Sequence, residues 1–316
     1  MEISVTMPVY NVDPYLQQAV ESALAQPETA EIIIVEDGSN DAGWTICQDL
    51  AQRDSRIRLF RHPNGENRGL AVSRNLAIAQ SRCEYLAFLD SDDYYLPGRF
   101  TKAAQLFAED PKIDGVWEAV GLSFEDEETK RRFSDPDRAL HTIIAGFDPD
   151  SLLQDLIENK GWFHFDGMVV KRSLMERTGP FEENVRTGTV LGMEFKMAAA
   201  GRIVPGSLDK PVAMRRMYGQ SITARMRRAA DLRDNKRVFR EAWEWAKDKD
   251  LSPSKKCLMF LAACWGDAVP YADSPWPVPQ LAKAASLGLN LAQNPGMLFS
   301  PALWQLLARR AAKKRG

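Results

Sequence analysis

Positions 85–93 read Tyr85-Leu86-Ala87-Phe88-Leu89-Asp90-Ser91-Asp92-Asp93, which places three carboxylates directly behind a short apolar run. The run predicts a buried strand, and the acids stand at its carboxyl end, where open α/β sheets bind their ligands. Two acids spaced D-x-D can hold one divalent cation that bridges a diphosphate, because Mg²⁺ in proteins takes one or two carboxylates together with phosphate oxygens. A solvated turn after a strand has the same pattern, so the surrounding sequence must decide between the two.

Three earlier apolar runs also end in polar residues, at 3–7, 31–35 and 57–60. Segments with helical spacing separate the runs, at 15–25, 42–53 and 69–79. Strands that alternate with helices of this length predict right-handed βαβ units and a mostly parallel sheet covered on both faces. Tyr10, Asp37 and the acids from Asp90 to Asp93 are therefore expected at one edge of one sheet.

Four motifs of this region, in order, resemble those of the family 2 glycosyltransferases. They are Met7-Pro8-Val9-Tyr10-Asn11, Val35-Glu36-Asp37-Gly38-Ser39, Asn67-Arg68-Gly69-Leu70-Ala71-Val72-Ser73-Arg74-Asn75 and Asp90-Ser91-Asp92-Asp93. Glu36 replaces the family's first Asp, and Ser73 stands where Ala is usual. The resemblance implies a GT-A fold, a Rossmann-like and mostly parallel sheet flanked by helices, which binds a nucleotide sugar.

The resemblance covers residues 1–110 and is looser to about 225. We expect a GT-A domain over 1–225, with a nucleotide-sugar donor half at 1–110 and an acceptor half at 111–225. From 226 the strand-like runs cease and helical spacing dominates, which predicts a helical C-terminal extension over 226–316. The length of 316 residues fits about two domains.

The resemblance places the donor site in the loops that follow the strands. It implies donor contacts by Pro8, Val9, Tyr10, Asn11, Asp37, Gly69, Arg74, Asp90, Ser91 and Asp92. Asp37 can accept the imide N–H of a uracil or thymine ring, or it can belong to a turn that leads into a helix cap. Tyr10 can stack on the base, because aromatic faces bind bases with little geometric demand, or it is an ordinary half-buried aromatic.

The charged residues of this site are expected to bind the diphosphate. Asp92 is predicted to hold a divalent cation, Mn²⁺ or Mg²⁺, with Asp90 directed toward the ribose. Arg74 can reach the nucleotide or hold the acidic loop by an ion pair. A later segment, Arg216-Met217-Tyr218-Gly219-Gln220-Ser221-Ile222-Thr223, matches a family stretch in which a His lies near the metal. Tyr218 takes that position, and a neutral phenol is a poor metal ligand.

Transfer with inversion requires a base that removes the proton of the attacking hydroxyl. The family supplies it from a Glu-Asp pair at the start of a helix, and the matching residues here are Gly192-Met193-Glu194. Glu194 is the predicted base, although an acid in a first helical turn is also stabilised by the helix dipole alone. Glu182, Glu183 and Asp166 are the alternatives.

The predicted acceptor contacts are Trp162 and His164, in the aromatic-rich segment 161–168. Aromatic faces pack against sugar rings, but aromatic residues also dominate protein cores. A group of arginines, Arg215, Arg216, Arg225, Arg227 and Arg228, offers charge for a leaving diphosphate or forms the solvated face of a helix.

Composition limits the partners. A net charge of −2 argues against nucleic acid as a partner. Four cysteines without zinc spacing, and a first strand that begins within three residues, predict a cytoplasmic protein without a leader. The segment 301–315 is basic and amphipathic, and it either packs on the domain or rests peripherally on the cytoplasmic face of a membrane.

Together these observations predict an inverting, metal-dependent transferase that moves a sugar from a nucleoside diphosphate sugar to a hydroxyl of a glycan or lipid-linked acceptor. Family tendency favours UDP as the nucleotide. The alternative is a non-catalytic nucleotide-sugar-binding or assembly subunit of polysaccharide synthesis, which the departures at Met193 and Tyr218 suggest.

Overall fold

The computed structural model describes residues 1–133, 140–141, 149–158, 163–184, 188–219, 228–268 and 278–313. The chain divides into two units. The first contains residues 1–183 and 200–225, and the second contains residues 184–199 and 226–316.

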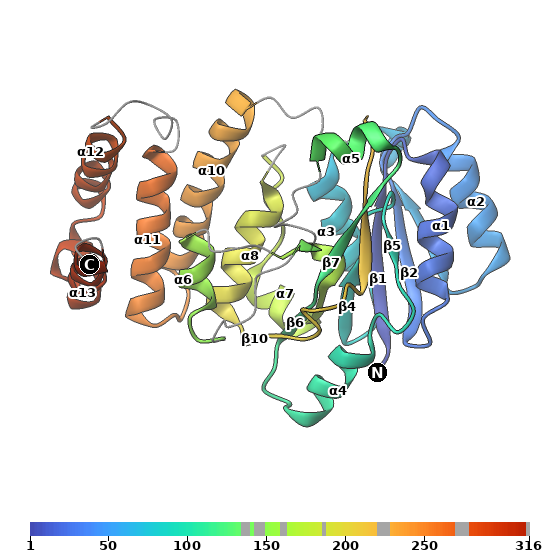
Figure 1. The fold of residues 1–316 in the computed structure, drawn as a ribbon, viewed down its shortest axis with the longest axis horizontal. Coiled ribbons are helices and arrows are strands. Elements are labelled where there is room, and N and C mark those ends of the chain that lie inside the picture. Colours follow the sequence, from blue (N-terminus) through green and yellow to red (C-terminus); the bar gives the residue numbers. More distant parts are fainter. Residues whose placement is uncertain are drawn as a thin grey trace. The chain divides into compact units, whose positions relative to one another are not determined.

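A seven-stranded sheet forms the centre of the first unit (Figure 1). Its strand order is β10-β6-β9-β4-β1-β2-β3. The bounds are β1 Ile3–Val9, β2 Thr29–Glu36, β3 Ile57–Arg61, β4 Tyr85–Phe88, β6 Gly115–Trp117, β9 Met168–Lys171 and β10 Ile203–Pro205. β1 pairs in parallel with β2 and β4, β2 with β3, and β6 with β10. β9 alone runs antiparallel, between β4 and β6, so the predicted mostly parallel sheet is confirmed.

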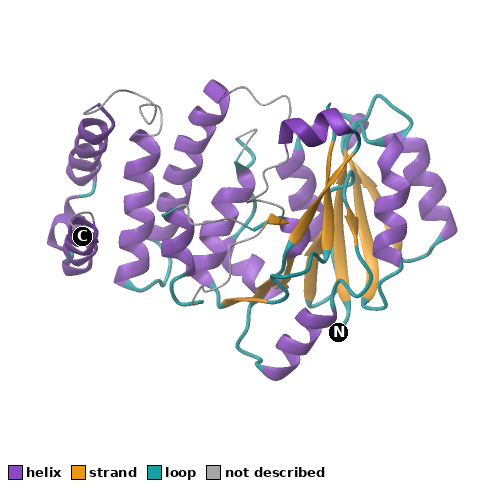
Figure 2. Cartoon of the chain, viewed as in Figure 1, coloured by secondary structure: helices purple, strands orange, loops and turns teal. Residues whose placement is uncertain are grey.

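Helices cover both faces of this sheet (Figure 2). Their bounds are α1 Asp13–Leu24, α2 Gly43–Arg53, α3 Leu70–Gln80, α4 Thr101–Glu109 and α7 Arg172–Thr178. Strand β2 shows why helices are needed on both faces of the sheet. Its Ile32 and Ile34 pack with residues of α1 and α2, whereas Ile33 and Val35 pack with Ala77 of α3 on the opposite face. A parallel strand buried on both faces therefore has a continuous apolar sequence.

A smaller sheet has the order β5-β11-β7-β8. Its strands are β5 Tyr94–Tyr95, β7 Val120–Phe124, β8 Leu140–His141 and β11 Ala213–Met217. β11 runs antiparallel to β5 and parallel to β7. Because β5 follows the acidic motif directly, this pairing brings residues near 216 next to it. The remaining elements of the unit are α5 Glu127–Phe133, α6 Leu152–Ile157, η1 Pro63–Gly65 and η3 Phe165–Gly167.

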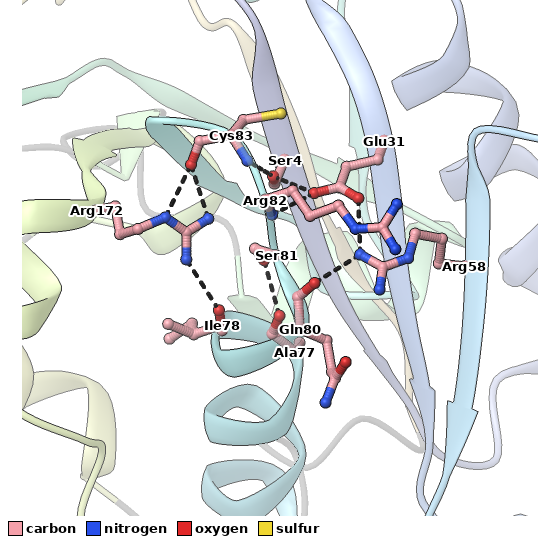
Figure 3. Close-up of polar contacts among 10 residues, drawn as sticks. All are labelled: Ser4, Glu31, Arg58, Ala77, Ile78, Gln80, Ser81, Arg82, Cys83 and Arg172. Carbon is pink, nitrogen blue, oxygen red and sulfur yellow. Dashed lines mark hydrogen bonds and ion pairs between the residues drawn. The ribbon is translucent and has the colours of Figure 1, made fainter.

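A polar network joins the amino ends of the central strands, at the end of the sheet away from the acidic motif (Figure 3). Glu31 of β2 accepts hydrogen bonds from the Ser4 hydroxyl at 2.6 Å, from Arg58 at 2.9 Å and from the backbone N–H of Arg82 at 2.6 Å. Arg172 donates two hydrogen bonds to the carbonyl of Cys83, at 3.0 and 2.7 Å. These contacts fix the start of β4 and thus the position of the acids at its other end.

The second unit is helical in its described residues. It contains α8 Thr189–Ala200, α10 Arg228–Lys247, α11 Pro253–Ala268, α12 Val278–Gln293, η5 Pro295–Phe299 and α13 Pro301–Lys313. Stacked rings of Phe195 and Phe239 join α8 to α10, and an edge-to-face pair of Trp243 and Phe260 joins α10 to α11. Helix α8, which the sequence analysis puts in the acceptor half, thus packs with the C-terminal helices. No described helix is both long enough and apolar enough to cross a membrane.

Candidate functional site

The acidic motif forms a tight turn between β4 and β5. The backbone N–H of Asp93 donates to the carbonyl of Asp90 at 2.9 Å, which closes the turn. Asp166 lies beside it in η3, and its Oδ1 accepts the backbone N–H of Asp90 at 3.1 Å. Since β4, β1 and β2 are neighbours and parallel, this turn shares the carboxyl edge of the sheet with Tyr10 and Asp37, as predicted.

Among the described residues, Asp90, Asp93 and His164 form a group able to bind a metal ion. One ligand atom from each lies within 4.8 Å of the other two. Two carboxylates and an imidazole are donors that suit a divalent cation such as Mn²⁺. From the sequence, Asp92 is the predicted ligand and His164 a predicted acceptor contact. In the structure Asp92 lies outside this group, and His164 faces the acids, with Nδ1 3.3 Å from Asp166 Oδ2.

The electrostatics of the turn are unfavourable without a cation. Burial, and then the charge of Asp166, raise the pKa of Asp93 well above its usual value. Burial and the charge of Asp90 raise the pKa of Asp92 to about 6. Burial acts to raise the pKa of Asp166. The charge and hydrogen bond of His164, together with hydrogen bonds from Asp93 and the backbone of Asp90, outweigh burial and lower this pKa to about 2. A positive charge at this position would relieve the repulsion between the carboxylates, so the residues present fit a metal ion.

Arg74 of α3 supplies one positive charge to the turn. Its guanidinium is 2.5 Å from Asp90 Oδ1, and it lies against the rings of Phe165 and Phe181 at 5.6 Å each. Of the two uses that the sequence leaves open for Arg74, the structure shows the ion pair that holds the acidic loop. The side chain is only 2% exposed.

Residues at the end of β11 hydrogen-bond the acidic turn. The backbone N–H of Arg216 donates to Asp93 Oδ1 at 2.7 Å, and its Nε donates to the carbonyl of Asp92 at 2.9 Å. Arg216 also stacks over the ring of Tyr15 at 4.5 Å, so this arginine is part of the site rather than of a solvated helix face. The Tyr218 hydroxyl donates to Asp92 Oδ2 at 2.9 Å. Burial and the charge of Asp92 raise the pKa of Tyr218, which keeps it a neutral donor.

Asp37 holds the loop in front of α3. Its carboxylate accepts the backbone N–H groups of Arg68 at 2.7 Å and Gly69 at 2.9 Å, and the side-chain amide of Asn67 at 3.1 Å. Gly38 has a φ of +74°, and a Cβ there would lie 2.7 Å from the backbone of this loop. The close approach explains the glycine. Recognition of a base by Asp37 stays a prediction.

The loop after β1 is locked to the loop after β2. The backbone N–H of Asn40 donates to Asn11 Oδ1 at 2.8 Å, and that of Asn11 donates to Ser39 Oγ at 3.1 Å. Pro8 and Val9 are buried in β1, whereas the neighbouring Tyr10 is 42% exposed. Stacking of Tyr10 on a base stays a prediction. Ser91, also predicted as a donor contact, is buried within the acidic turn.

Glu194 lies in α8 of the second unit and is 2% exposed. Burial raises its pKa well above the ordinary value. Its role as the base stays a prediction. Trp162, the other predicted acceptor contact, lies outside the described residues.

Asp93 is not among the residues predicted from the sequence, and the position of His164 and Asp166 beside the acids is not predicted either. Asp93 is adjacent to Asp92 in the quoted motif, so it could have been included. His164 and Asp166 precede β9, which pairs antiparallel with β4. Their position depends on that insertion into a parallel sheet, which no local pattern in the chain indicates.

Comparison with known proteins identifies the family. The sequence profile of Glycosyl transferase family 2 matches residues 4–179, more than half of the chain, and the chain belongs to this family. It is 30% identical over 187 residues to a Bacillus subtilis protein named uncharacterized glycosyltransferase EpsJ. The aligned region covers 58% of this chain and 52% of EpsJ. It is 35% identical over 109 residues to the succinoglycan biosynthesis protein ExoU of Rhizobium meliloti, covering 34% of this chain and 30% of ExoU. The match thus spans about half of EpsJ and less of ExoU.

Solved structures share the fold. S. aureus TarS in complex with UDP-GlcNAc superposes with a TM-score of 0.65 at 17% identity, covering 92% of this chain and 81% of that one. The mannosyltransferase PcManGT of Pyrobaculum calidifontis, in complex with GDP-Man and Mn²⁺, gives a TM-score of 0.58 at 20% identity, covering 100% and 81%. The GT-A fold predicted from the motifs is confirmed.

Proposed function

We propose that this protein transfers a sugar, with inversion, from a nucleoside diphosphate sugar to a hydroxyl of a glycan or lipid-linked acceptor. The observation that carries the proposal is the acidic turn behind β4, beside which Asp90, Asp93 and His164 can bind one cation. UDP is the proposed nucleotide, and TarS, one of the solved relatives, binds UDP-GlcNAc. None of the four cysteines, all of which lie in the described part of the chain, forms a disulfide, which fits the proposed location in the cytoplasm.

The donor side is assigned to the carboxyl edge of the central sheet. Asp90, Asp93 and His164 hold Mn²⁺ or Mg²⁺, with Asp92 as a further carboxylate beside them. When bound, the cation supplies positive charge to the diphosphate and stabilises it as a leaving group. Tyr10 stacks on the base with its exposed ring, and Asp37 accepts from the base edge.

The acceptor side is assigned to Glu194, which removes the proton of the attacking hydroxyl. Burial raises the pKa of Glu194, and a carboxyl group with a raised pKa is a stronger base once it is deprotonated. Trp162 and His164 are retained as the predicted acceptor contacts, although His164 has the additional role described above.

Sugar transfer from each member of a panel of nucleotide sugars tests this proposal, and the released nucleoside diphosphate is the quantity measured. Asp90→Asn and Asp93→Asn should each lower turnover at least about a hundredfold, because each removes a proposed cation ligand. Asp49→Asn, at an exposed position of α2, is the matched control and should keep full turnover. Unchanged turnover in both site variants would contradict the proposal.

A non-catalytic nucleotide-sugar-binding subunit is the second candidate. Tyr218 favours this candidate. The tyrosine occupies the position of a family His near the metal, and its hydroxyl hydrogen-bonds Asp92. If this candidate is correct, the protein binds a nucleotide in the presence of a cation. It then neither transfers the sugar of any donor in the panel nor hydrolyses any donor slowly. Turnover of a single donor excludes it.

A further inference from the structure

The charge of the chain is divided unevenly along the sequence. All 43 Asp and Glu residues precede position 274, together with 35 of the 41 Lys and Arg residues, so this part has a net charge of −8. The last 43 residues contain six cations and no acid. The cations are Lys283, Arg309, Arg310, Lys313, Lys314 and Arg315. A segment of this composition is attracted to anionic surfaces, whatever the charge of the rest of the protein.

Helix α12, in this same segment, has two leucines on the outside, whereas its Leu291 is buried. Leu281 is 63% and Leu289 is 57% exposed. The polar Ser286 and Asn290 are buried instead, and the amide of Asn290 donates to the Ser286 carbonyl at 2.9 Å. A helix of a water-soluble unit normally shows the opposite arrangement. The outer face of α12 is therefore suited to an apolar partner.

The segment that follows adds two exposed aromatic rings. Phe299 at the end of η5 is 84% exposed, and Trp304 of α13 is half exposed. The indole N–H of Trp304 donates to the carbonyl of Leu298 at 2.7 Å, so the ring can enter an apolar phase without losing its hydrogen bond. Leu303, next to Trp304 in α13, is fully buried, so this helix has a packed side and an exposed side.

We propose that these residues form a docking surface for an anionic lipid bilayer. We call it the C-terminal apolar surface, and it consists of Leu281, Leu289, Leu298, Phe299 and Trp304. Leucine and aromatic side chains of such a surface insert at the level of the headgroups, and neighbouring cations bind the anionic lipids. The segment lies on the membrane rather than spanning it. This inference is independent of the transferase proposal, because lipid binding needs neither donor nor cation.

Co-sedimentation of the whole protein with vesicles tests the proposal. The expected result is binding to vesicles of phosphatidylcholine and phosphatidylglycerol, weak binding to phosphatidylcholine alone, and loss of binding at high salt. The double variant Leu281→Ser/Phe299→Ser should weaken binding about tenfold or more. Both side chains are mainly exposed, so the variant keeps its fold. Leu70→Ser, which removes an exposed leucine of α3, is the matched control and should bind as the parent does.

A second variant separates charge from apolar insertion. Replacing Arg309, Arg310, Lys313 and Lys314 by Gln should weaken binding to the anionic vesicles by about fivefold for each cation removed. Replacing four exposed cations of the first unit, Arg53, Lys112, Lys130 and Arg131, should have little effect. Equal binding of parent and C-terminal variants, or no binding to either vesicle, would overturn the proposal. A dimer in solution that Leu281→Ser/Phe299→Ser dissociates, without lipid binding, would assign the surface to a second copy of the chain instead.

Discussion

The hydroxyl of Tyr218 donates a 2.9 Å hydrogen bond to Oδ2 of Asp92. Tyr218 follows β11 and Asp92 follows β4, so this contact joins the smaller sheet to the acidic turn. It also keeps one carboxylate of the turn at a fixed position and partly offsets the effect of burial on its pKa.

Replacement of Tyr218 by Phe tests this contact. The variant keeps the ring packed against Tyr15 but removes the donor to Asp92. A hydrogen bond to a charged group is worth about 1.5–3 kcal/mol, but this one is already present without the ion. Only the loss of the fixed position of Asp92 affects the affinity, so Mn²⁺ should bind at most about tenfold more weakly. Calorimetric titration with Mn²⁺ measures the change. An unaltered dissociation constant would mean that Asp92 does not contribute to the cation site.

Cation binding should depend on pH through Asp92. Because burial and the charge of Asp90 raise its pKa to about 6, Asp92 gains a proton as the pH falls below that value. A protonated carboxyl does not bind a cation, so the affinity for Mn²⁺ should decrease below about pH 6 by up to about tenfold per pH unit. Titrations from pH 5 to 8 check this. The dependence should become weaker in Asp92→Asn but not disappear, because burial also raises the pKa of the proposed ligand Asp93.

Arg74 should stabilise the protein chiefly in the absence of metal. Arg74→Met leaves Asp90 without its ion-pair partner, and the free energy of unfolding should fall by about 2 kcal/mol, since Asp90 stays partly exposed. Mn²⁺ should restore part of the loss, because a bound cation takes over the charge of Arg74. Denaturant unfolding with and without Mn²⁺ provides the measurement. Arg53→Met, which breaks an exposed pair with Asp49, should change stability by less than about 0.5 kcal/mol in either condition.

The network at the amino ends of the strands should be a source of stability that disappears in acid. Burial works to raise the pKa of Glu31, but hydrogen bonds from Ser4, Arg58 and Arg82 outweigh it and lower the pKa below 4.5. An acid with a lowered pKa stabilises the fold above its unfolded pKa, and this contribution is lost as the pH falls through the folded pKa.

Glu31→Gln should therefore cost about 1–3 kcal/mol at neutral pH, and the difference from the parent should shrink in acid. Denaturant unfolding at several pH values measures both effects. Glu21→Gln changes an exposed acid of α1 and is the matched control. A difference that stays constant with pH would show that the charge of Glu31 is not what stabilises the network.

The parts of the fold that follow from local pattern were predictable. The apolar runs at 3–7, 31–35 and 57–60 lie in β1, β2 and β3, because parallel strands need continuous burial and helices must cover both faces. The acidic turn and its edge of the sheet follow from the same alternation. The contacts around the turn do not, since His164, Asp166 and Tyr218 reach it through β9 and β11, whose pairing joins residues far apart in the sequence.

The catalytic assignment has its own test in Glu194→Gln. The substitution keeps the size of the side chain but removes the proposed base, so transfer should fall by about a hundredfold to ten-thousandfold while donor binding is unchanged. The pH profile of the parent should show a basic group above the usual range of Glu, since burial raises the pKa of Glu194. Glu244→Gln, on the partly exposed surface of α10, is the control. Full turnover of Glu194→Gln would remove this residue from the mechanism.

The central claim is that a cation held by the acidic turn binds a nucleoside diphosphate. Calorimetric titration of the purified protein with UDP, with and without Mn²⁺, tests it most directly. The account predicts UDP binding at least about tenfold tighter with Mn²⁺, and loss of that difference in the double variant Asp90→Asn/Asp93→Asn. Equal affinity with and without Mn²⁺, or a Mn²⁺ effect that persists in the double variant, would contradict it.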